Sequence, residues 1–184
     1  ALVRTEAALA QAQEDSESRR KLVDILHEVT LDLSVTELYQ LLVGRAARAL
    51  GVSHCSVILA SPGSRTAQVV AAVENPKVNN LDVRLDRYPE LQAALETGQP
   101  VLVEDVASHP LYDGVRQLWN LEGLEVEIRS VIALPFTVDR GAYGVFLVRR
   151  TRTQDSFGPA DLEFAQAVVT AAVAVIQRAR MVEH

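Results

Sequence analysis

The sequence predicts a three-layer α+β fold in which an antiparallel sheet of five to six strands lies between helical layers. Apolar residues with helical spacing occur near both ends of the chain, in residues 22–50 and 162–179. Between them lie short apolar runs rich in β-branched residues, of which 130–136 and 143–148 are the clearest. The stretch 104–123 separates this last pair of strands from the earlier ones. Helices flanking an antiparallel meander favour a sheet covered on both faces.

Residues 1–34 are predicted to form one long helix ahead of the domain. The stretch 1–20 is rich in Ala, Glu, Gln and Arg and contains no Gly or Pro, and helical spacing continues at Leu22, Leu26, Val29 and Leu33. Such a helix is roughly 45 Å long, so part of it should project or pair with another chain. A solvated tail before Arg19 is the alternative. We divide the chain into a coiled-coil-like linker helix, 1–34, and a globular domain, 35–184.

The first half of the domain follows from local signals. Ser34 or Thr36 can cap a second helix that runs to Leu50, and Gly51 can end it. The following elements are then expected, in order: strands at 54–60 and 67–73, a short extended segment at 81–85, a helix at 89–96 and a short strand at 101–103. The segment 104–123 is expected to be irregular or partly helical.

The last third of the chain predicts a hairpin and a long helix. A turn at 138–141 separates the two strand-length apolar runs. Gly158 can cap the helix, Pro159 fits its first position, and Asp161 faces its positive end. The apolar stripe that follows is Ala165, Val168, Val169, Ala172, Val173 and Ile176.

Composition restricts the function. The net charge of −6 and the pI near 5.2 give no basic surface, so no nucleic-acid partner is expected. The single cysteine, Cys55, excludes a disulfide framework and fits a reducing compartment. No apolar run is expected to reach the roughly 20 residues of a membrane span, and the stretch 1–20 is too polar for a signal peptide. A cytoplasmic protein without membrane contact is predicted.

Motifs for catalysis and metal binding are absent from the sequence. Its four histidines, His27, His54, His109 and His184, are scattered without ligand spacing. No nucleophile elbow or phosphate-binding loop occurs. The sequence therefore predicts a non-enzymatic protein with no cofactor and no metal.

Several segments resemble the GAF family. The hairpin, the Phe157-x-x-x-Asp161 spacing and the small-residue helix resemble the C-terminal half of a GAF domain. Residues 85–91, 97–105 and 109–112 resemble the middle of GAF modules in bacterial two-component proteins. The resemblance implies that terminal helices cover one sheet face, and that a lid of short helices and loops covers the other. Small molecules bind under that lid in the family.

The predicted lid carries a mixture of aromatic and charged side chains. The candidate ligand-binding residues are Tyr88, Asp105, Tyr112, Arg116, Trp119 and Arg129. Aromatic rings provide flat apolar walls, and arginines pair a carboxylate or phosphate bidentately, while Asp105 would orient a donor. Alternatively, Trp119 only packs the lid onto the sheet, and Tyr88 only precedes a helix start. A cavity of roughly 300 Å³ or more beneath residues 102–119 favours the ligand.

Three specialised GAF activities are disfavoured. GAF-type methionine-sulfoxide reductases work through several cysteines, and bilin-binding members attach the chromophore through a cysteine in the lid. Cys55 instead lies in the first predicted strand. Cyclic-nucleotide members carry a dispersed Asn-Lys-Phe-Asp-Glu signature, of which Phe157 and Asp161 remain, while Leu162 replaces the glutamate.

The predicted function is a non-enzymatic sensory GAF domain of a bacterial signalling protein. It would bind a small molecule, relay the signal through its terminal helices, and form a homodimer through residues 21–33 and 162–179. The alternative is a ligand-free dimerisation or spacer module between a receiver and an output domain. A GAF-type redox enzyme is a third candidate, and the single cysteine argues against it.

Overall fold

The computed structural model describes residues 34–78, 80–139 and 142–183. Most of the predicted linker helix, residues 1–33, lies outside the described residues. The tip of the predicted turn at 138–141 lies outside them as well. The linker helix and the proposed division of the chain at residue 34 therefore stay predictions.

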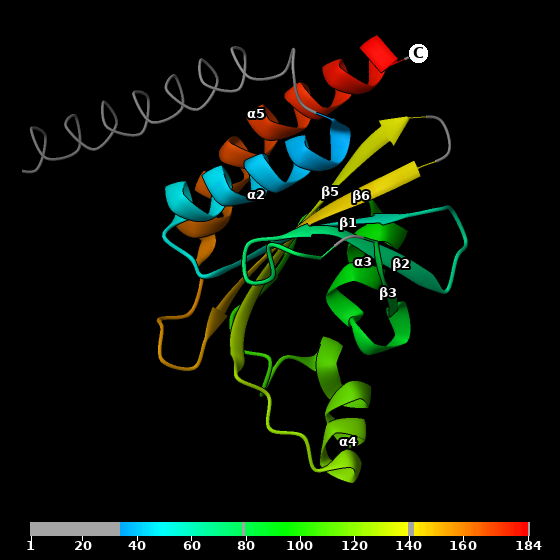
Figure 1. Ribbon diagram of the computed structural model, residues 1–184. Helices are drawn as coiled ribbons and strands as arrows, with labels where there is room; N and C mark the ends of the chain where they lie inside the picture. Colours follow the sequence, from blue (N-terminus) through cyan, green and yellow to red (C-terminus); the bar gives the residue numbers. More distant parts are fainter. Residues whose placement is uncertain (1–33, 79, 140–141, 184) are drawn as a thin grey trace, which may run out of the picture.

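In the described part of the chain, six strands form one antiparallel sheet in the order β3-β2-β1-β6-β5-β4 (Figure 1). The strands are β1 (His54–Ala60), β2 (Thr66–Ala72), β3 (Leu81–Arg84), β4 (Val101–Val103), β5 (Ile128–Asp139) and β6 (Ala142–Thr151). The two strands of the predicted hairpin, β5 and β6, are longer than the apolar runs that predicted them. The antiparallel α+β fold and its strand number are confirmed.

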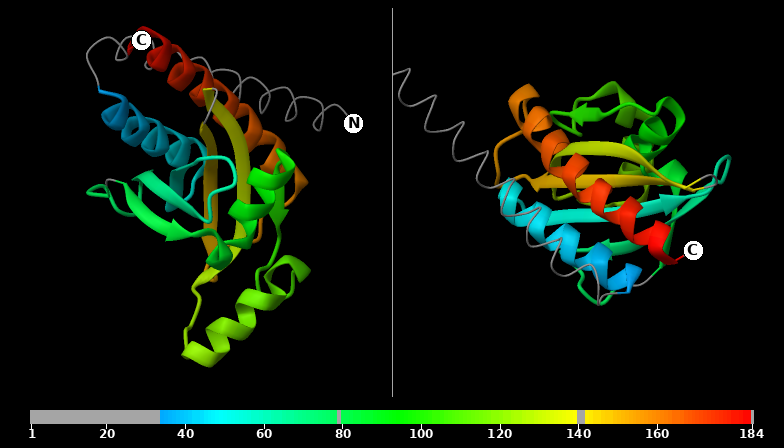
Figure 2. Two further views of the ribbon diagram at one scale, coloured as in Figure 1. Left: turned by 90° about the vertical axis from the view of Figure 1, so that its right-hand side faces the viewer. Right: turned by 90° about the horizontal axis from the view of Figure 1, so that it is seen from above.

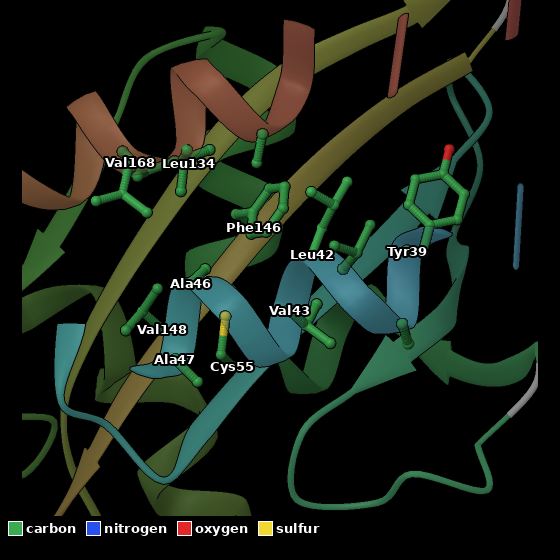
Figure 3. Close-up of a cluster of buried hydrophobic side chains, with 14 of the residues drawn as sticks. Tyr39, Leu42, Val43, Ala46, Ala47, Cys55, Leu134, Phe146, Val148 and Val168 are labelled. Atoms are coloured by element: carbon green, nitrogen blue, oxygen red, sulfur yellow. The ribbon is translucent and has the colours of Figure 1, made fainter. Parts of the chain in front are cut away.

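Two helices, α2 (Val35–Leu50) and α5 (Pro159–Glu183), lie side by side across one face of the sheet (Figures 1 and 2). We call this the helix face. Its buried side chains form one apolar cluster (Figure 3), which includes Leu38, Leu42, Ala46, Phe146, Val148, Val168, Ala172 and Ile176. Alanines on both helices allow them to approach closely. The predicted placement of the terminal helices of the domain is therefore confirmed.

The ends of α2 are set by single residues. The Ser34 side-chain oxygen accepts a hydrogen bond from the Glu37 N–H at 3.2 Å, which satisfies a free donor in the first turn. Gly51 adopts the left-handed conformation with φ 65° and ends the helix. Both predicted ends of this helix are confirmed.

The start of α5 is held from within the chain. The Gly158 N–H donates to Asp161 Oδ2 at 2.8 Å, and Pro159 is the first residue of the helix. Phe157 is buried, and the guanidinium carbon of Arg150 lies 4.4 Å from the centroid of its ring. The Phe157 and Asp161 pattern thus has a structural role in fixing where α5 begins.

Ser130 joins three segments at one buried hydroxyl. Its Oγ donates a hydrogen bond to the Val103 carbonyl at 2.8 Å and accepts one from the Phe157 N–H at 2.9 Å. These residues belong to β5, β4 and the segment before α5, so the hydroxyl ties the sheet edge to the start of the last helix.

The opposite face, which we call the lid face, carries short helices. These are η1 (Leu85–Arg87), α3 (Pro89–Thr97), η2 (Pro110–Tyr112) and α4 (Asp113–Glu122). Helix α3 lies against the sheet, while α4 extends away from it (Figures 1 and 2). Val115 is the buried residue of α4, and Leu121 is 84% exposed. The segment expected to be irregular is therefore two short helices, of which the second packs through little of its surface.

Helix α5 contains an apolar stretch of 21 residues, Pro159–Ala179, which by length and composition alone could cross a membrane. One side of this stretch is buried in the helix-face cluster through residues such as Ala165, Val168 and Ala172. Packing against the sheet thus accounts for its apolar composition. The expectation that no apolar segment reaches this length is wrong for α5.

Candidate functional site

A cavity of about 500 Å³ lies between the lid face of the sheet and the lid helices, and we call it the lid cavity. It is larger than the roughly 300 Å³ at which ligand pockets begin. Its apolar lining is Val83, Tyr88, Val106, Tyr112, Trp119, Leu124, Val126, Ile128 and Val131. Its charged lining is Asp82, Arg84, Arg87, Glu90, Glu122 and Arg149. Apolar walls with a few charged groups are the usual make-up of a small-molecule site.

Aromatic side chains form one wall of the lid cavity. The rings of Tyr112 and Trp119 are 5.9 Å apart between centroids and tilted by 42°. Tyr112 is 3% exposed, whereas Trp119 is only partly buried. The wall is therefore fixed at its inner end and accessible at its outer end.

Tyr112 is tied to a buried carboxyl group. Its hydroxyl donates a hydrogen bond to Glu90 Oε2 at 2.6 Å, and Glu90 is 3% exposed. Burial raises the pKa of Glu90 above its ordinary value, which the hydrogen bond from Tyr112 partly opposes. Burial also raises the pKa of Tyr112, and the negative charge of Glu90 adds to this effect. The pair connects η2 to α3 at the inner end of the cavity.

Arg149 brings a positive charge to the same cavity. It follows Val145 and Leu147 on the lid face of β6. Its Nη2 donates to Glu74 Oε1 at 3.0 Å. Among the described residues, its Nε is the buried side-chain nitrogen or oxygen that has no hydrogen-bond partner. Arg149 also lines a smaller adjoining cavity of about 180 Å³.

An ion pair crosses the rim of the lid cavity. Arg87 Nη2 lies 2.6 Å from Glu122 Oε1, so the pair joins η1 to the end of α4. The hydrogen bond from Arg87 lowers the pKa of the exposed Glu122 carboxyl. Exposed pairs of this kind contribute little to stability, so this link between two lid helices is weak.

A second cavity, of about 630 Å³, lies on the other side of Trp119. The two cavities share four wall residues, Val106, Trp119, Leu124 and Val126. Arg116 lines the second cavity, but its Nη1 donates to the carbonyls of Val106 and His109, both at 2.8 Å. Its Nη2 pairs with Asp113. The guanidinium group of Arg116 therefore stabilises the fold of the lid.

A sequence model of the GAF domain matches residues 32–177, which is most of the chain. The chain belongs to the GAF domain family. The GAF domain of an Acinetobacter phosphoenolpyruvate-protein phosphotransferase is 21% identical, with a TM-score of 0.65, and the match covers 90% of this chain and 94% of that one. No curated protein matches the chain.

Two further solved structures are similar in fold. The phycocyanobilin-bound GAF domain of a cyanobacterial phytochrome is 15% identical, with a TM-score of 0.67 and a match covering 92% of this chain and 97% of that one. The free methionine-R-sulfoxide reductase of Neisseria meningitidis, in complex with its substrate, is 17% identical, with a TM-score of 0.62 and coverage of 89% and 91%. At these identities the likeness concerns the fold.

The structure distributes the six predicted ligand-binding residues of this GAF domain unequally. Tyr88, Tyr112 and Trp119 line the lid cavity. Arg116 lines the neighbouring cavity with its guanidinium already bonded. Asp105 and Arg129 line neither cavity, because Asp105 Oδ1 accepts a hydrogen bond from the Ala107 N–H and Arg129 donates to the Gln154 carbonyl. The structure therefore brings the aromatic candidates together and places the charged ones outside their cavity.

The sequence analysis missed Arg149 and Glu90. Both line the lid cavity, one from β6 and one from α3. Strand alternation carries the signal for Arg149, since Val145, Leu147 and Arg149 share one face of β6. The apolar run ends at Val148, so the strand was expected to end before Arg149.

The lone cysteine of this GAF domain lies on the opposite side of the sheet from the lid cavity. Cys55 is fully buried in the helix-face cluster, close to α2 (Figure 3). Burial raises the pKa of its thiol to about 12, so the reactive thiolate is disfavoured. Within the described residues, no group of three His, Cys, Asp or Glu side chains could hold a metal ion.

Proposed function

We propose that this chain is a sensory GAF domain that binds a small molecule in the lid cavity and relays binding through α2 and α5. In this proposal it belongs to a bacterial two-component signalling protein in the cytoplasm. The observation that carries it is the cavity itself, with Tyr88, Tyr112 and Trp119 in its walls. In the rival interpretation of Trp119, the aromatic side chains fill the space beneath the lid, and this cavity argues against it.

The relay runs through contacts that already join the two faces. The cavity borders β5 and β6, whose alternate residues pack under α2 and α5. Ser130 bonds both β4 and the segment that begins α5. A ligand that binds one arrangement of the lid more tightly shifts the population of arrangements on the helix face. The terminal helices pass this shift to neighbouring domains.

A non-enzymatic role is part of the proposal. The thiol of Cys55 is buried on the face opposite the cavity, which argues against a redox reaction there. The similar bilin-bound and reductase structures each hold a small molecule, which supports ligand binding as a use of this fold.

A ligand-free dimerisation module is the second candidate. It is supported by α2 and α5, which lie side by side on one face of the sheet (Figure 2), and by Ala174, a small residue exposed on α5. In either case we propose a homodimer through the terminal helices. The two candidates differ in whether the cavity has an occupant.

A ligand screen by thermal shift distinguishes the two candidates. At a concentration of 100 Kd a ligand stabilises the folded state by about 2.7 kcal/mol, which for a domain of this size raises the Tm by roughly 5 °C or more. Trp119→Ala should abolish the shift, because it removes a cavity wall. Leu121→Ala, on the same helix but 84% exposed, should preserve it. A broad screen without a specific shift would leave the dimerisation module as the function.

A further inference from the structure

We propose that the lid cavity selects a small monoanion, a carboxylate attached to a flat apolar body, and that Arg149 binds the carboxylate. The ligand class rests on the sensory function proposed above and makes it specific. It differs from the sequence-based expectation, in which Arg116 and Arg129 were to bind the anion.

Arg149 is the cation of this cavity with unused hydrogen-bonding capacity. Its Nε is buried and has no partner, although a guanidinium can donate five hydrogen bonds. A buried donor without a partner is unfavourable. The side chain lines both the lid cavity and the smaller adjoining one, so its charge faces this space from the sheet. A carboxylate oxygen would supply the missing acceptor once the guanidinium turns toward it.

The other two arginines of the cavity are already paired near its rim. Arg84 Nη2 lies 2.5 Å from Asp86 Oδ2, and Arg87 Nη2 lies 2.6 Å from Glu122 Oε1. Arg149 is paired with Glu74 as well, but among the arginines of the cavity it is the one with a buried donor that has no partner. One such cation favours a monoanion over a polyphosphate.

Glu74 is the built-in competitor for this cation. Its Oε1 accepts from Arg149 Nη2 at 3.0 Å, and its Oε2 accepts from the Cys55 N–H at 3.1 Å. A ligand carboxylate must share or replace the first of these bonds. Removing the charge of Glu74 should therefore strengthen anion binding.

The remaining lining suits a flat apolar body. Tyr88, Tyr112 and Trp119 contribute rings, and aliphatic side chains of β5 and the lid complete the wall. Glu90 faces the same cavity, but Tyr112 already bonds its carboxyl and burial raises its pKa, which weakens its repulsion of an anion. The cavity thus combines an apolar wall with one cation that has a hydrogen-bond donor without a partner.

Isothermal titration with matched probes tests this proposal. The probes are indole-3-acetate and benzoate, each compared with its neutral amide. We expect the wild-type protein to bind at least one acid about tenfold or more tightly than its amide, as charge-assisted hydrogen bonds are about twice as strong as neutral ones. Arg149→Gln should remove this preference, and Glu74→Gln should raise the affinity for the acid severalfold.

Two further variants keep the test decisive. Arg149→Lys retains the charge but lacks the planar donor pair, so it should lose at least threefold in affinity even if Arg149→Gln does not fold. Arg150→Gln, the next residue on the same strand, changes a side chain that packs on Phe157 at the other face. It should leave the preference for the acid unchanged.

The outcomes separate the ligand class from the sensory function. Equal binding of acid and amide, or a preference that survives in Arg149→Gln, overturns the anion assignment and leaves a ligand-binding domain. If no probe binds but the ligand screen finds a neutral or cationic compound, the anion assignment is again overturned. If neither the probes nor the screen give binding, both proposals are overturned.

Discussion

The two faces of the sheet differ in how completely their buried side chains are packed and hydrogen-bonded. On the helix face, Val57, Phe146 and Ile176 are each 0% exposed within one apolar cluster. On the lid face, β3, β5 and β6 border the lid cavity, whose lining includes a buried carboxyl and an arginine with an unpartnered donor. Val148 and Arg149 are neighbours on β6, and their side chains lie on opposite faces of the sheet. The comparison shows one tightly packed face and one face that retains a cavity and a buried donor without a partner.

The largest expected loss of stability comes from placing a charge within the helix-face cluster. Ile176→Glu places a charge at a fully buried position of α5 among apolar neighbours. An unpaired buried charge is strongly unfavourable, so we expect a loss of about 3 kcal/mol or more in the free energy of unfolding, measured by urea titration. Thr170→Glu, an exposed position on the same helix, should change stability by less than about 0.5 kcal/mol. Similar losses in the two variants would contradict the assignment of the buried side of α5.

Alanine substitutions at two glycines, one on each face, should change the free energy of unfolding in opposite directions. A Cβ at Gly144 would lie 2.3 Å from Phe136 Cζ, whereas a Cβ at Gly114 in α4 meets nothing within 4 Å. Gly144→Ala should therefore destabilise by roughly 1–3 kcal/mol. Gly114→Ala should stabilise by up to about 1 kcal/mol, because alanine favours a helix. Thermal and urea unfolding measure both, and two changes of the same sign would show that the faces do not differ in this way.

The buried carboxyl of the lid face predicts a pH effect of intermediate size. The folded-state pKa of Glu90 is raised above its ordinary value of 4.5, so its protonated form favours folding. This contribution is present at pH below 4.5 and is lost as pH rises through the raised value. Tyr112 and Arg149, which also face Glu90, oppose the shift only in part. Glu90→Gln should flatten this fall in stability.

Urea unfolding from pH 4 to 8 measures the contribution of Glu90. Glu96→Gln, an exposed position on the same helix α3, is the matched control and should retain the wild-type fall. An unchanged pH profile in Glu90→Gln would show that the buried pair with Tyr112 does not couple folding to protonation.

The smallest effect on stability concerns the outer surface of the packed face. Ala174 is exposed on α5, within the segment proposed for the homodimer. Ala174→Glu should leave the free energy of unfolding of one domain within about 0.5 kcal/mol but weaken association severalfold. Sedimentation at micromolar concentration tests this. A full-length chain that is monomeric, or a dimer unaffected by the charge, would contradict the proposed interface.

The elements of the fold could be predicted where local chemistry decides them. Ser34 and Gly51 set the ends of α2 through one hydrogen bond and one left-handed residue. Pro159, whose fixed φ suits the first helical position, sets the start of α5. Helix α4 was harder to predict although its apolar residues have helical spacing, because the helix is short and largely polar and Val115 is its buried residue.

The candidate site could be predicted only in part, because charged side chains depend on partners that are distant in sequence. The aromatic residues reached the cavity because large rings in a lid have few other places to be buried. Arg116 instead bonds the carbonyls of Val106 and His109, which come together only when the turn before η2 folds. Arg149 was not predicted because β6 continues beyond Val148, where the apolar run that predicted the strand ends.

The Ser130 hydroxyl has a consequence for the rate of unfolding. Its two partners, Val103 and Phe157, are each 27 residues away along the chain, on either side. Closing both loops requires three distant segments to assemble, and such long-range contacts form late in folding. These two hydrogen bonds should therefore mainly lower the unfolding rate, with little influence on the folding rate.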